Sequence, residues 1–294
     1  MKKPQTRTSV AGLLGTLAFV TAGLLAGTAA TPALAHRAEP LDYVALGDSY
    51  TSGIGAPDVK VSPLYPVDPT NPQPCYQASP GYPDVLDRRA GVELTVNAAC
   101  SGWTAAMVPT QVQVAANAGL LNHKTDLVTV TAGGNDVSFQ DILAACLVPS
   151  PLDACKAAVK SAEAFAKTEV RAALTNAYAA IRAKARNATI VALGYPHLFS
   201  PEFGDQPYIT DEAAKVFNKG TDTLNKVIRN AAKDFRGTVY VDVTDEFDGH
   251  GIGSPASWVV FDGSMASFHP TATGYAKGYA PAVIREAGIP ALKN

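Results

Sequence analysis

Five short runs of apolar residues, rich in Val, Ile and Leu, recur along the chain with longer stretches of helical periodicity between them. Each run is nearly uninterrupted, which is typical of strands buried on both faces of a parallel sheet. The predicted strands are residues 42–46, 94–97, 127–132, 189–193 and 238–243. Their spacing suits strand–helix–strand units, in which a helix returns the chain to the start of the next strand.

The stretches between the runs predict helices. The longest pattern covers about residues 154–185, the next about 211–233 and the last about 273–287. In the longest pattern, apolar residues at i, i+4, i+8 and i+11 share one face; they are Val170, Leu174, Tyr178 and Ile181. Five strands with interposed helices predict an α/β protein, with a three-layer α/β/α fold of flavodoxin-like type around a five-stranded parallel sheet.

Residues 57–80 depart from this pattern. The segment contains seven prolines and little periodicity, so we expect a long surface excursion between the first strand and the next helix. A loop of this length would shape a substrate cleft, and a passive insertion is the alternative.

The first 35 residues are typical of a leader. A basic start with Lys2, Lys3 and Arg7 precedes a long apolar stretch, and an Ala-x-Ala site follows at 33–35. This order predicts a signal peptide over residues 1–35, a single domain over residues 36–294 and a secreted protein. An uncleaved membrane anchor is the alternative, since the apolar stretch is long enough to span a bilayer. A helix-breaking Thr-Pro pair at 31–32 favours cleavage, so no stable membrane anchor is expected.

The net charge and the length of the chain limit its possible binding partners and its number of domains. Without the three basic residues of the leader, the 24 basic residues become 21 against 26 acidic ones, a net charge of −5. A negative chain is a poor partner for nucleic acid or for an anionic membrane surface. The remaining 259 residues suffice for one large domain, and no low-complexity linker or repeat divides them.

Four cysteines, an even number in a chain predicted to be exported, favour disulfides. They allow three pairings, and we prefer the one that is local in sequence, Cys75–Cys100 with Cys146–Cys155. Each bridge would stabilise the fold by about 2–4 kcal/mol. A four-cysteine zinc site is disfavoured because no two cysteines have the short spacing that such sites use.

Candidate chemistry begins at the end of the first strand, where a Gly-Asp-Ser turn ends with Ser49. The turn out of a buried parallel strand is where α/β sheets present catalytic groups. A serine hydroxyl needs a base to take its proton. His269 is the strongest candidate, because the proline after it and a capping threonine hold it rigidly before the last predicted helix. Surface or structural roles are expected for the other histidines, His36, His123, His197 and His250.

Acyl transfer also needs hydrogen-bond donors aimed at the oxygen that becomes negative, each worth about 2.7–4 kcal/mol. One candidate is the backbone N–H of Ser49, and another is that of Gly102, where the missing Cβ allows close approach. The third is the side-chain amide of Asn135, in a Gly-Gly-Asn-Asp turn directly after the third predicted strand. Singly each is a common turn, and together they predict an oxyanion hole.

In this order the four blocks resemble the SGNH (GDSL) hydrolase family, close to the secreted actinobacterial lipases and esterases. The blocks span the mature chain and are Gly47-Asp48-Ser49, Gly102, Gly133-Gly134-Asn135-Asp136 and His269-Pro270. The resemblance implies Ser49 as nucleophile, His269 as general base, and an oxyanion hole of Ser49, Gly102 and Asn135. It also implies no metal and no cofactor. The ordinary α/β-hydrolase is excluded, because its Gly-x-Ser-x-Gly elbow is absent around Ser49.

One position departs from the family. An acid usually stands three residues before the histidine, and here that residue is Ala266. Something must still orient the imidazole and support its positive charge. We expect a Ser–His dyad assisted by the Ser267 carbonyl, with Asp262 as the alternative carboxylate and Asp245 or Asp248 as more distant ones.

The predicted reaction is hydrolysis of a carboxylic ester, by a lipase or esterase that acts as a monomer on a small-molecule or lipid ester. Four aromatic residues beside the blocks are candidates either for an acyl groove or for core: Tyr50, Trp103, Phe139 and Phe268. Deacetylation of a carbohydrate is the second hypothesis, and a catalytically silent secreted binding protein that keeps the fold is the third.

Overall fold

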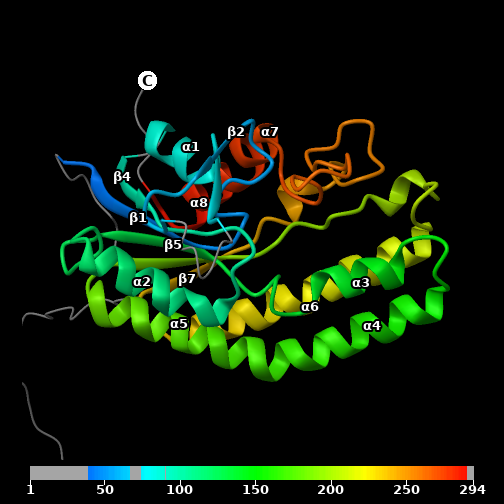
Figure 1. Cartoon of the computed structure of the whole chain (residues 1–294), viewed down its shortest axis with the longest axis horizontal. Helices are drawn as coiled ribbons and strands as arrows, with labels where there is room; N and C mark the ends of the chain where they lie inside the picture. Colours follow the sequence, from blue (N-terminus) through cyan, green and yellow to red (C-terminus); the bar gives the residue numbers. More distant parts are fainter. Residues whose placement is uncertain (1–38, 67–73, 90, 290–294) are drawn as a thin grey trace, which may run out of the picture. The chain divides into compact units, whose positions relative to one another are not determined.

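The computed structural model describes residues 39–66, 74–89 and 91–289. The expected signal peptide and His36 lie outside these residues, as does the middle of the 57–80 segment. The described residues form a parallel sheet between two layers of helices (Figure 1). The predicted α/β class and three-layer architecture are therefore confirmed.

The sheet consists of five parallel strands, each within two residues of its predicted bounds. They are β1 (Leu41–Gly47), β4 (Val92–Asn97), β5 (Leu127–Thr131), β6 (Thr189–Leu193) and β7 (Thr238–Val241). Their order in the sheet is β4-β1-β5-β6-β7. The chain first winds outward from β1 to β4 and then returns to the other side of β1 at β5. This change of direction creates the switch point at which such sheets bind ligands.

The helices form two layers, one on each face of the sheet (Figure 1). One layer contains α1 (Tyr82–Arg89) and α8 (Ala280–Glu286), and the other contains α2 (Val108–Asn117), α5 (Arg171–Lys184) and α6 (Asp211–Lys233). Two further helices, α3 (Phe139–Cys146) and α4 (Leu152–Phe165), pack against α6. No helix within the described ranges combines the length and apolar character needed to cross a bilayer.

Two of the predicted helices contain a π-helical turn. The turn η2 (Ala166–Val170) joins α4 to α5, so the predicted helix over about 154–185 is continuous. Near the C-terminus, α7 (Ala272–Gly274) and the turn η5 (Tyr275–Tyr279) lead into α8. The described residues also contain three short 3-10 turns, η1 (Ala105–Met107), η3 (Pro201–Phe203) and η4 (Asp245–Phe247).

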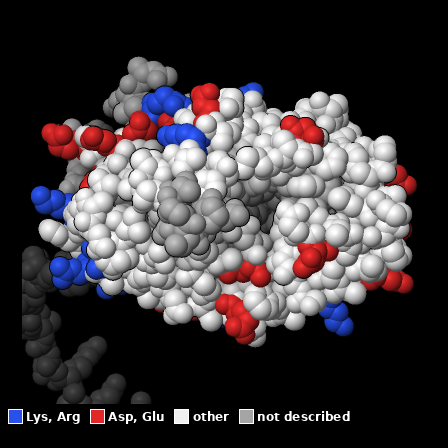
Figure 2. All heavy atoms as spheres, viewed as in Figure 1, with Lys and Arg blue, Asp and Glu red and all other residues white. Residues whose placement is uncertain are grey.

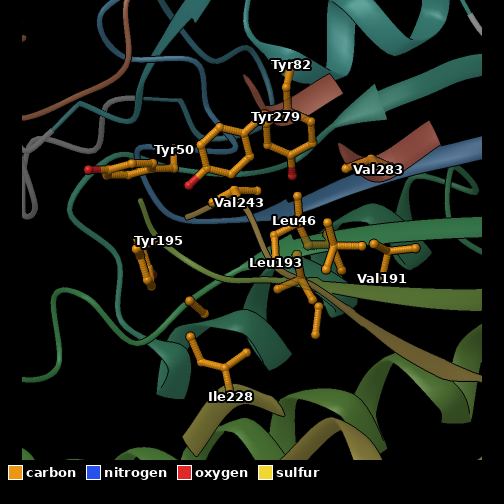
Figure 3. Close-up of a cluster of buried hydrophobic side chains, with 14 of the residues drawn as sticks. Leu46, Tyr50, Tyr82, Val191, Leu193, Tyr195, Ile228, Val243, Tyr279 and Val283 are labelled. Atoms are coloured by element: carbon orange, nitrogen blue, oxygen red, sulfur yellow. The ribbon is translucent and has the colours of Figure 1, made fainter. Parts of the chain in front are cut away.

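The core lies on both faces of the central strands. Leu46 and Leu193 are fully buried, with Tyr279 and Val283 on one side of the sheet and Ile228 of α6 on the other (Figure 3). A fully buried side chain of this size stabilises the fold by about 1.5–3 kcal/mol. The sheet is therefore a rigid base for the turns that leave its strands.

The segment 57–80 is more ordered than expected at its two ends. The strands β2 (Asp58–Val61) and β3 (Tyr76–Ser79) pair antiparallel there. The side chain of Gln77 is buried, and its Nε2 donates to the carbonyls of Asn97 and Ala99, each at 2.8 Å. The sequence did not indicate these two strands, because four-residue strands are too short to give a recognisable alternation.

Candidate active site

Ser49 and His269 meet at the carboxyl end of β1. The Oγ of Ser49 lies 2.7 Å from Nε2 of His269, across 220 residues of sequence. Ser49 follows the strand directly, and His269 lies just before α7, whose first turn is capped by the hydroxyl of Thr271 through a 3.2 Å bond from the N–H of Gly274. The structure thus brings the predicted nucleophile and base within hydrogen-bond distance.

A backbone carbonyl, and not a carboxylate, faces the other ring nitrogen of His269. Its Nδ1 lies 3.2 Å from the carbonyl oxygen of Ala266. Because a carbonyl can only accept, Nδ1 carries the proton and Nε2 is free to accept the Ser49 proton. This bond goes to the residue before Ser267, and the carbonyl of Ser267, the expected partner, also acts on the imidazole. Asp262 accepts instead from the hydroxyls of Ser264 and Ser267, at 2.6 and 3.1 Å.

Burial lowers the pKa of His269 from 6.5 to about 4, while the carbonyls of Ala266 and Ser267 act in the opposite direction. To act as the predicted base, His269 must be neutral, so kcat/KM should fall as the pH drops through this pKa. We expect the acid limb of kcat/KM near pH 4 rather than near 6.5. Folding stability should decline at higher pH than activity does, as the pH falls from about 6.5 to about 4, because in that range the unfolded chain binds the proton and the folded one does not.

Ala266→Asp tests this interpretation of the acid limb. A carboxylate beside Nδ1 would stabilise the imidazolium and move the acid limb upward by about one pH unit or more. Ala266→Asn, with the same shape and no charge, is the matched control and should leave the limb in place. A wild-type limb at or above pH 6.5 would contradict the proposed environment of His269.

The three predicted oxyanion donors each keep a hydrogen that no described group accepts. Among the described residues, neither the N–H of Ser49 nor that of Gly102 has a hydrogen-bond partner, so both are available to a substrate oxygen. The amide Nδ2 of Asn135 donates one hydrogen to the carbonyl of Trp103 at 2.8 Å and keeps a second. Gly102 has φ +81°, and a Cβ added there would meet no atom within 4 Å. The backbone angle, rather than lack of space, therefore explains this glycine.

The loop that carries Gly102 is held from both sides. Cys100 forms a disulfide with Cys75 of the β2–β3 segment, as predicted, and Cys146 forms the second one with Cys155. From the other side, the carboxylate of Asp136 accepts the N–H of Ala105 at 2.9 Å. Together with the bond from Asn135, this contact fixes the turn after β5 against the loop after β4.

The backbone beside His269 is strained. Phe268 has φ +68°, which costs a non-glycine residue about 1–3 kcal/mol. Its carbonyl accepts the hydroxyl of Tyr50 at 2.7 Å. Tyr50 follows the nucleophile directly, so one hydrogen bond connects the turn of Ser49 to the loop of His269.

Gly47 and Gln111 set the course of the chain into the nucleophile turn. Gly47 has φ +127°, and a Cβ added there would lie 2.0 Å from the carbonyl oxygen of Thr131. The buried amide of Gln111, from α2, accepts the N–H of Gly47 and donates to its carbonyl, both at 2.7 Å. Sequence reasoning missed Gln111, which lies outside every motif.

Asp48 connects the nucleophile turn to the turn that carries Asn135. Its buried carboxylate accepts from the hydroxyls of Thr131, at 2.7 Å, and Tyr195, and from the N–H of Tyr50 at 3.0 Å. The hydroxyl of Tyr195 in turn accepts the N–H of Gly134 at 3.0 Å. Burial raises the pKa of Asp48 to about 6, although these hydrogen bonds lower it. Tyr195 was also missed; its position after β6, at the same edge of the sheet, was the available signal.

Tyr195→Phe should misplace Asn135 while the fold persists. Loss of the hydroxyl leaves the N–H of Gly134 and one oxygen of Asp48 without a partner, at a cost in stability of about 1–3 kcal/mol. We expect kcat to fall by between about tenfold and about 100-fold with little change in KM, because Asn135 acts after binding. Kinetics and urea unfolding measure the two effects.

Tyr279→Phe is the matched control for that prediction. It also removes a buried hydroxyl, which donates to the carbonyl of Gly194 at 3.0 Å and does not bond to Asp48. It should lower stability without a comparable loss of kcat. Equal losses of kcat in both variants would indicate that Tyr195 is merely structural.

An apolar pocket of about 520 Å³ begins at the catalytic pair. Its walls come from α3, α4, α6 and the loop 261–268. The apolar side chains that line it include Phe139, Ile142, Val159, Ala162, Phe217 and Leu224. Three of the four predicted groove aromatics line it, Tyr50, Phe139 and Phe268. Trp103 does not; its ring packs against Tyr65, with centroids 4.9 Å apart. The prediction for Trp103 was wrong because sequence proximity to Gly102 does not specify the side of the loop.

Two of the other described histidines, His197 and His250, have local partners. His197 lies 2.7 Å from a carboxylate oxygen of Asp222, and His250 stacks on Trp258 with centroids 3.6 Å apart. Within the described ranges, no three side chains of His, Cys, Asp or Glu form a group that could hold a metal ion.

Comparisons with known proteins agree with one another. Residues 45–277 match the profile of the GDSL-like Lipase/Acylhydrolase family. Lipase 1 of Streptomyces coelicolor is 32% identical over 279 residues, which cover 94% of this chain and 97% of that protein. The crystal structure of an extracellular lipase from Streptomyces rimosus superposes with a TM-score of 0.72 and 31% identity, over 84% of this chain and 99% of that one. Phospholipase A1 from Streptomyces albidoflavus gives a TM-score of 0.68 and 32% identity, with the same coverage.

Proposed function

The chain belongs to the GDSL-like lipase/acylhydrolase family and is a carboxylic ester hydrolase, and from this premise we propose that it acts through an acyl enzyme on Ser49 with His269 as general base. The observation that carries this proposal is the 2.7 Å contact between Ser49 Oγ and His269 Nε2. The proton on Nδ1 leaves Nε2 as the acceptor, as a general base requires.

In the first half of the reaction, Oγ of Ser49 attacks the ester carbonyl while its proton passes to Nε2 of His269. The carbonyl oxygen becomes negative and accepts hydrogen bonds from the N–H groups of Ser49 and Gly102 and from the Asn135 amide. When the intermediate collapses, the C–O bond to the alcohol breaks. His269 returns the proton to the departing oxygen, which leaves the acyl group on Ser49.

In the second half, water replaces the alcohol. His269 takes a proton from the water, whose oxygen attacks the acyl carbon, and the same three donors stabilise the second intermediate. When this intermediate collapses, the bond from the acyl carbon to Oγ breaks and His269 returns the proton to Oγ, which releases the carboxylic acid and restores the Ser49 hydroxyl. The carbonyl of Ala266 keeps the imidazole in the productive orientation through both halves, the task that a carboxylate performs in a triad.

The apolar pocket supports an acyl chain of medium or long length. Its volume of about 520 Å³ falls within the range of about 300–1,000 Å³ that ligand pockets have. An acetyl group would leave most of it empty, whereas each methylene added to the chain buries apolar surface worth about 0.8 kcal/mol. The pocket therefore favours a lipase or long-chain esterase over a carbohydrate deacetylase.

A series of p-nitrophenyl esters from acetate to palmitate tests this assignment. We expect kcat/KM to rise from acetate to octanoate by up to about fourfold per methylene, the equivalent of 0.8 kcal/mol. Ala162→Leu places a larger side chain in the pocket wall and should lower the octanoate-to-acetate ratio by about tenfold or more. Initial rates at substrate concentrations below KM give each value directly.

Ala164→Leu is the matched control, since Ala164 is exposed on the same helix and does not line the pocket. It should keep the wild-type ratio. A deacetylase would instead lose activity beyond two or three carbons, and that profile in the wild type would contradict the acyl-pocket assignment.

We also propose that residues 1–35 are removed and that the protein is secreted as a single domain. The basic and apolar leader supports this, as do the two disulfides and the extracellular lipase of Streptomyces rimosus, which resembles the chain over most of its length. N-terminal sequencing of protein recovered from culture medium should begin at His36.

A further inference from the structure

Large apolar side chains are exposed around the mouth of the pocket. Phe261 is 38% exposed and Met265 is 55% exposed, and both also line the pocket. They belong to a short loop that ends at His269. Exposed apolar groups gathered at a binding site commonly mark a surface for interaction with another apolar phase.

The exposed groups continue away from the pocket. The ring of Phe261 lies between Phe268, 5.4 Å away, and Tyr208, 4.4 Å away, measured between centroids. The carbonyl of Tyr208 accepts the N–H of Val148 at 2.9 Å, and Val148 is 49% exposed. We call Val148, Tyr208, Phe261 and Met265 the mouth rim. The mouth rim extends from Phe268, the residue before His269, to the outer surface.

The loop of the mouth rim is held in shape by its own hydrogen bonds. The carboxylate of Asp262 accepts from the N–H and the hydroxyl of Ser264, at 2.9 and 2.6 Å. The hydroxyl of Ser267 accepts the N–H of Gly263 at 2.8 Å. Met265 is thus displayed by an organised turn, so little conformational entropy is lost when it enters an apolar phase.

The segments that carry the rim residues are acidic. Residues 125–155, 187–214 and 237–276 contain acidic residues and no Lys or Arg, and the first lysines of α4 and α6 beyond them, Lys156 and Lys215, lie against Asp153 and Asp211. Figure 2 shows a hollow near the centre of this face, with acidic side chains beside it on the side of α3 and α6. Anionic lipid headgroups would be repelled here, whereas an uncharged surface would not.

We propose that the mouth rim docks on an electrically neutral lipid surface, so that the pocket opens directly onto the lipid from which it takes its ester. The inference rests on the proposed function, because esters with acyl chains long enough to fill the pocket collect in lipid aggregates rather than in water. Phe261 and Met265 would enter the acyl region, with Asp262 kept in the headgroup layer.

Binding to vesicles tests the proposal without hydrolysis. The Ser49→Ala variant is sedimented with phosphatidylcholine vesicles, and its partition coefficient is compared with that of the same chain carrying Phe261→Ser and Met265→Ser. We expect the double substitution to lower the coefficient by about tenfold or more, because membrane binding scales with buried apolar area. Replacing part of the phosphatidylcholine with phosphatidylglycerol should weaken binding further.

Phe165→Ser in the same Ser49→Ala background is the matched control, since Phe165 is 45% exposed on α4 and does not line the pocket. It should bind as its parent does. The proposal is overturned if the parent binds no phosphatidylcholine, if Phe165→Ser loses as much as the double substitution, or if phosphatidylglycerol strengthens binding. If the Ser49→Ala parent binds vesicles but the wild-type protein hydrolyses no ester, the docking proposal is supported and the proposed reaction is contradicted.

Discussion

Replacing Ser49 with alanine should lower kcat/KM for ester hydrolysis by at least about 10⁴-fold, since the acyl intermediate can no longer form. His269→Ala should cost a similar factor, because the hydroxyl 2.7 Å from Nε2 then has no base. The double variant should be no slower than either single one, because the two residues act as a unit. Hydrolysis of p-nitrophenyl octanoate, with near-UV circular dichroism as a check on folding, measures all three.

Ser52→Ala is the control for this set. Its buried hydroxyl lies in the same turn and donates to the carbonyl of Ser49 at 3.2 Å, away from the imidazole. Its loss should change the rate by less than about tenfold. If Ser49→Ala kept the wild-type rate, or if losses in the single variants multiplied in the double one, the proposed mechanism would be wrong.

Asn135→Ala should lower kcat by about 10²–10³-fold with a much smaller effect on KM, since the amide bonds an oxygen whose charge develops only in the transition state. Asn135→Asp retains the shape and replaces the donor with a negative acceptor, and it should be at least as slow. Pre-steady-state release of p-nitrophenol would show whether the loss falls on acylation.

Asp136→Asn is the adjacent control. Its side-chain oxygen can still accept the N–H of Ala105, now 2.9 Å from the Asp136 carboxylate, so the loop of Gly102 should stay in place. We expect near-wild-type kcat. A loss equal to that of Asn135→Ala would mean that the turn after β5 matters through its overall shape, and not through the amide of Asn135.

The sheet was predictable because its strands are buried on both faces. Runs such as β5, with all five residues buried, consist of apolar residues and β-branched threonines, both of which favour a strand. The pair β2 and β3 has no such signal, since β2 is exposed along its whole length and four residues carry too little periodicity. Helix α6 was predicted to its observed bounds, because it is long and its buried face repeats over six turns.

In the candidate site, residues with reactive side chains in recognisable turns were predictable, and those that support them were not. Tyr195 and Gln111 bind backbone and carboxylate groups that come from other parts of the chain, and neither has a motif of its own. The carbonyl that orients His269 belongs to Ala266, and a backbone acceptor leaves no trace in a sequence. Such support depends on how the loop turns, here through the positive φ of Phe268.

The distance in sequence between nucleophile and base has a consequence for synthesis. A ribosome releases Ser49 early, but His269 emerges 220 residues later, when all five strands have already been made. A nascent chain therefore holds a serine without a base, and so does any product truncated before His269. Under the proposed mechanism, hydrolysis begins only when His269 reaches Ser49, so ester turnover in a translation reaction would report completion of the fold rather than appearance of the nucleophile.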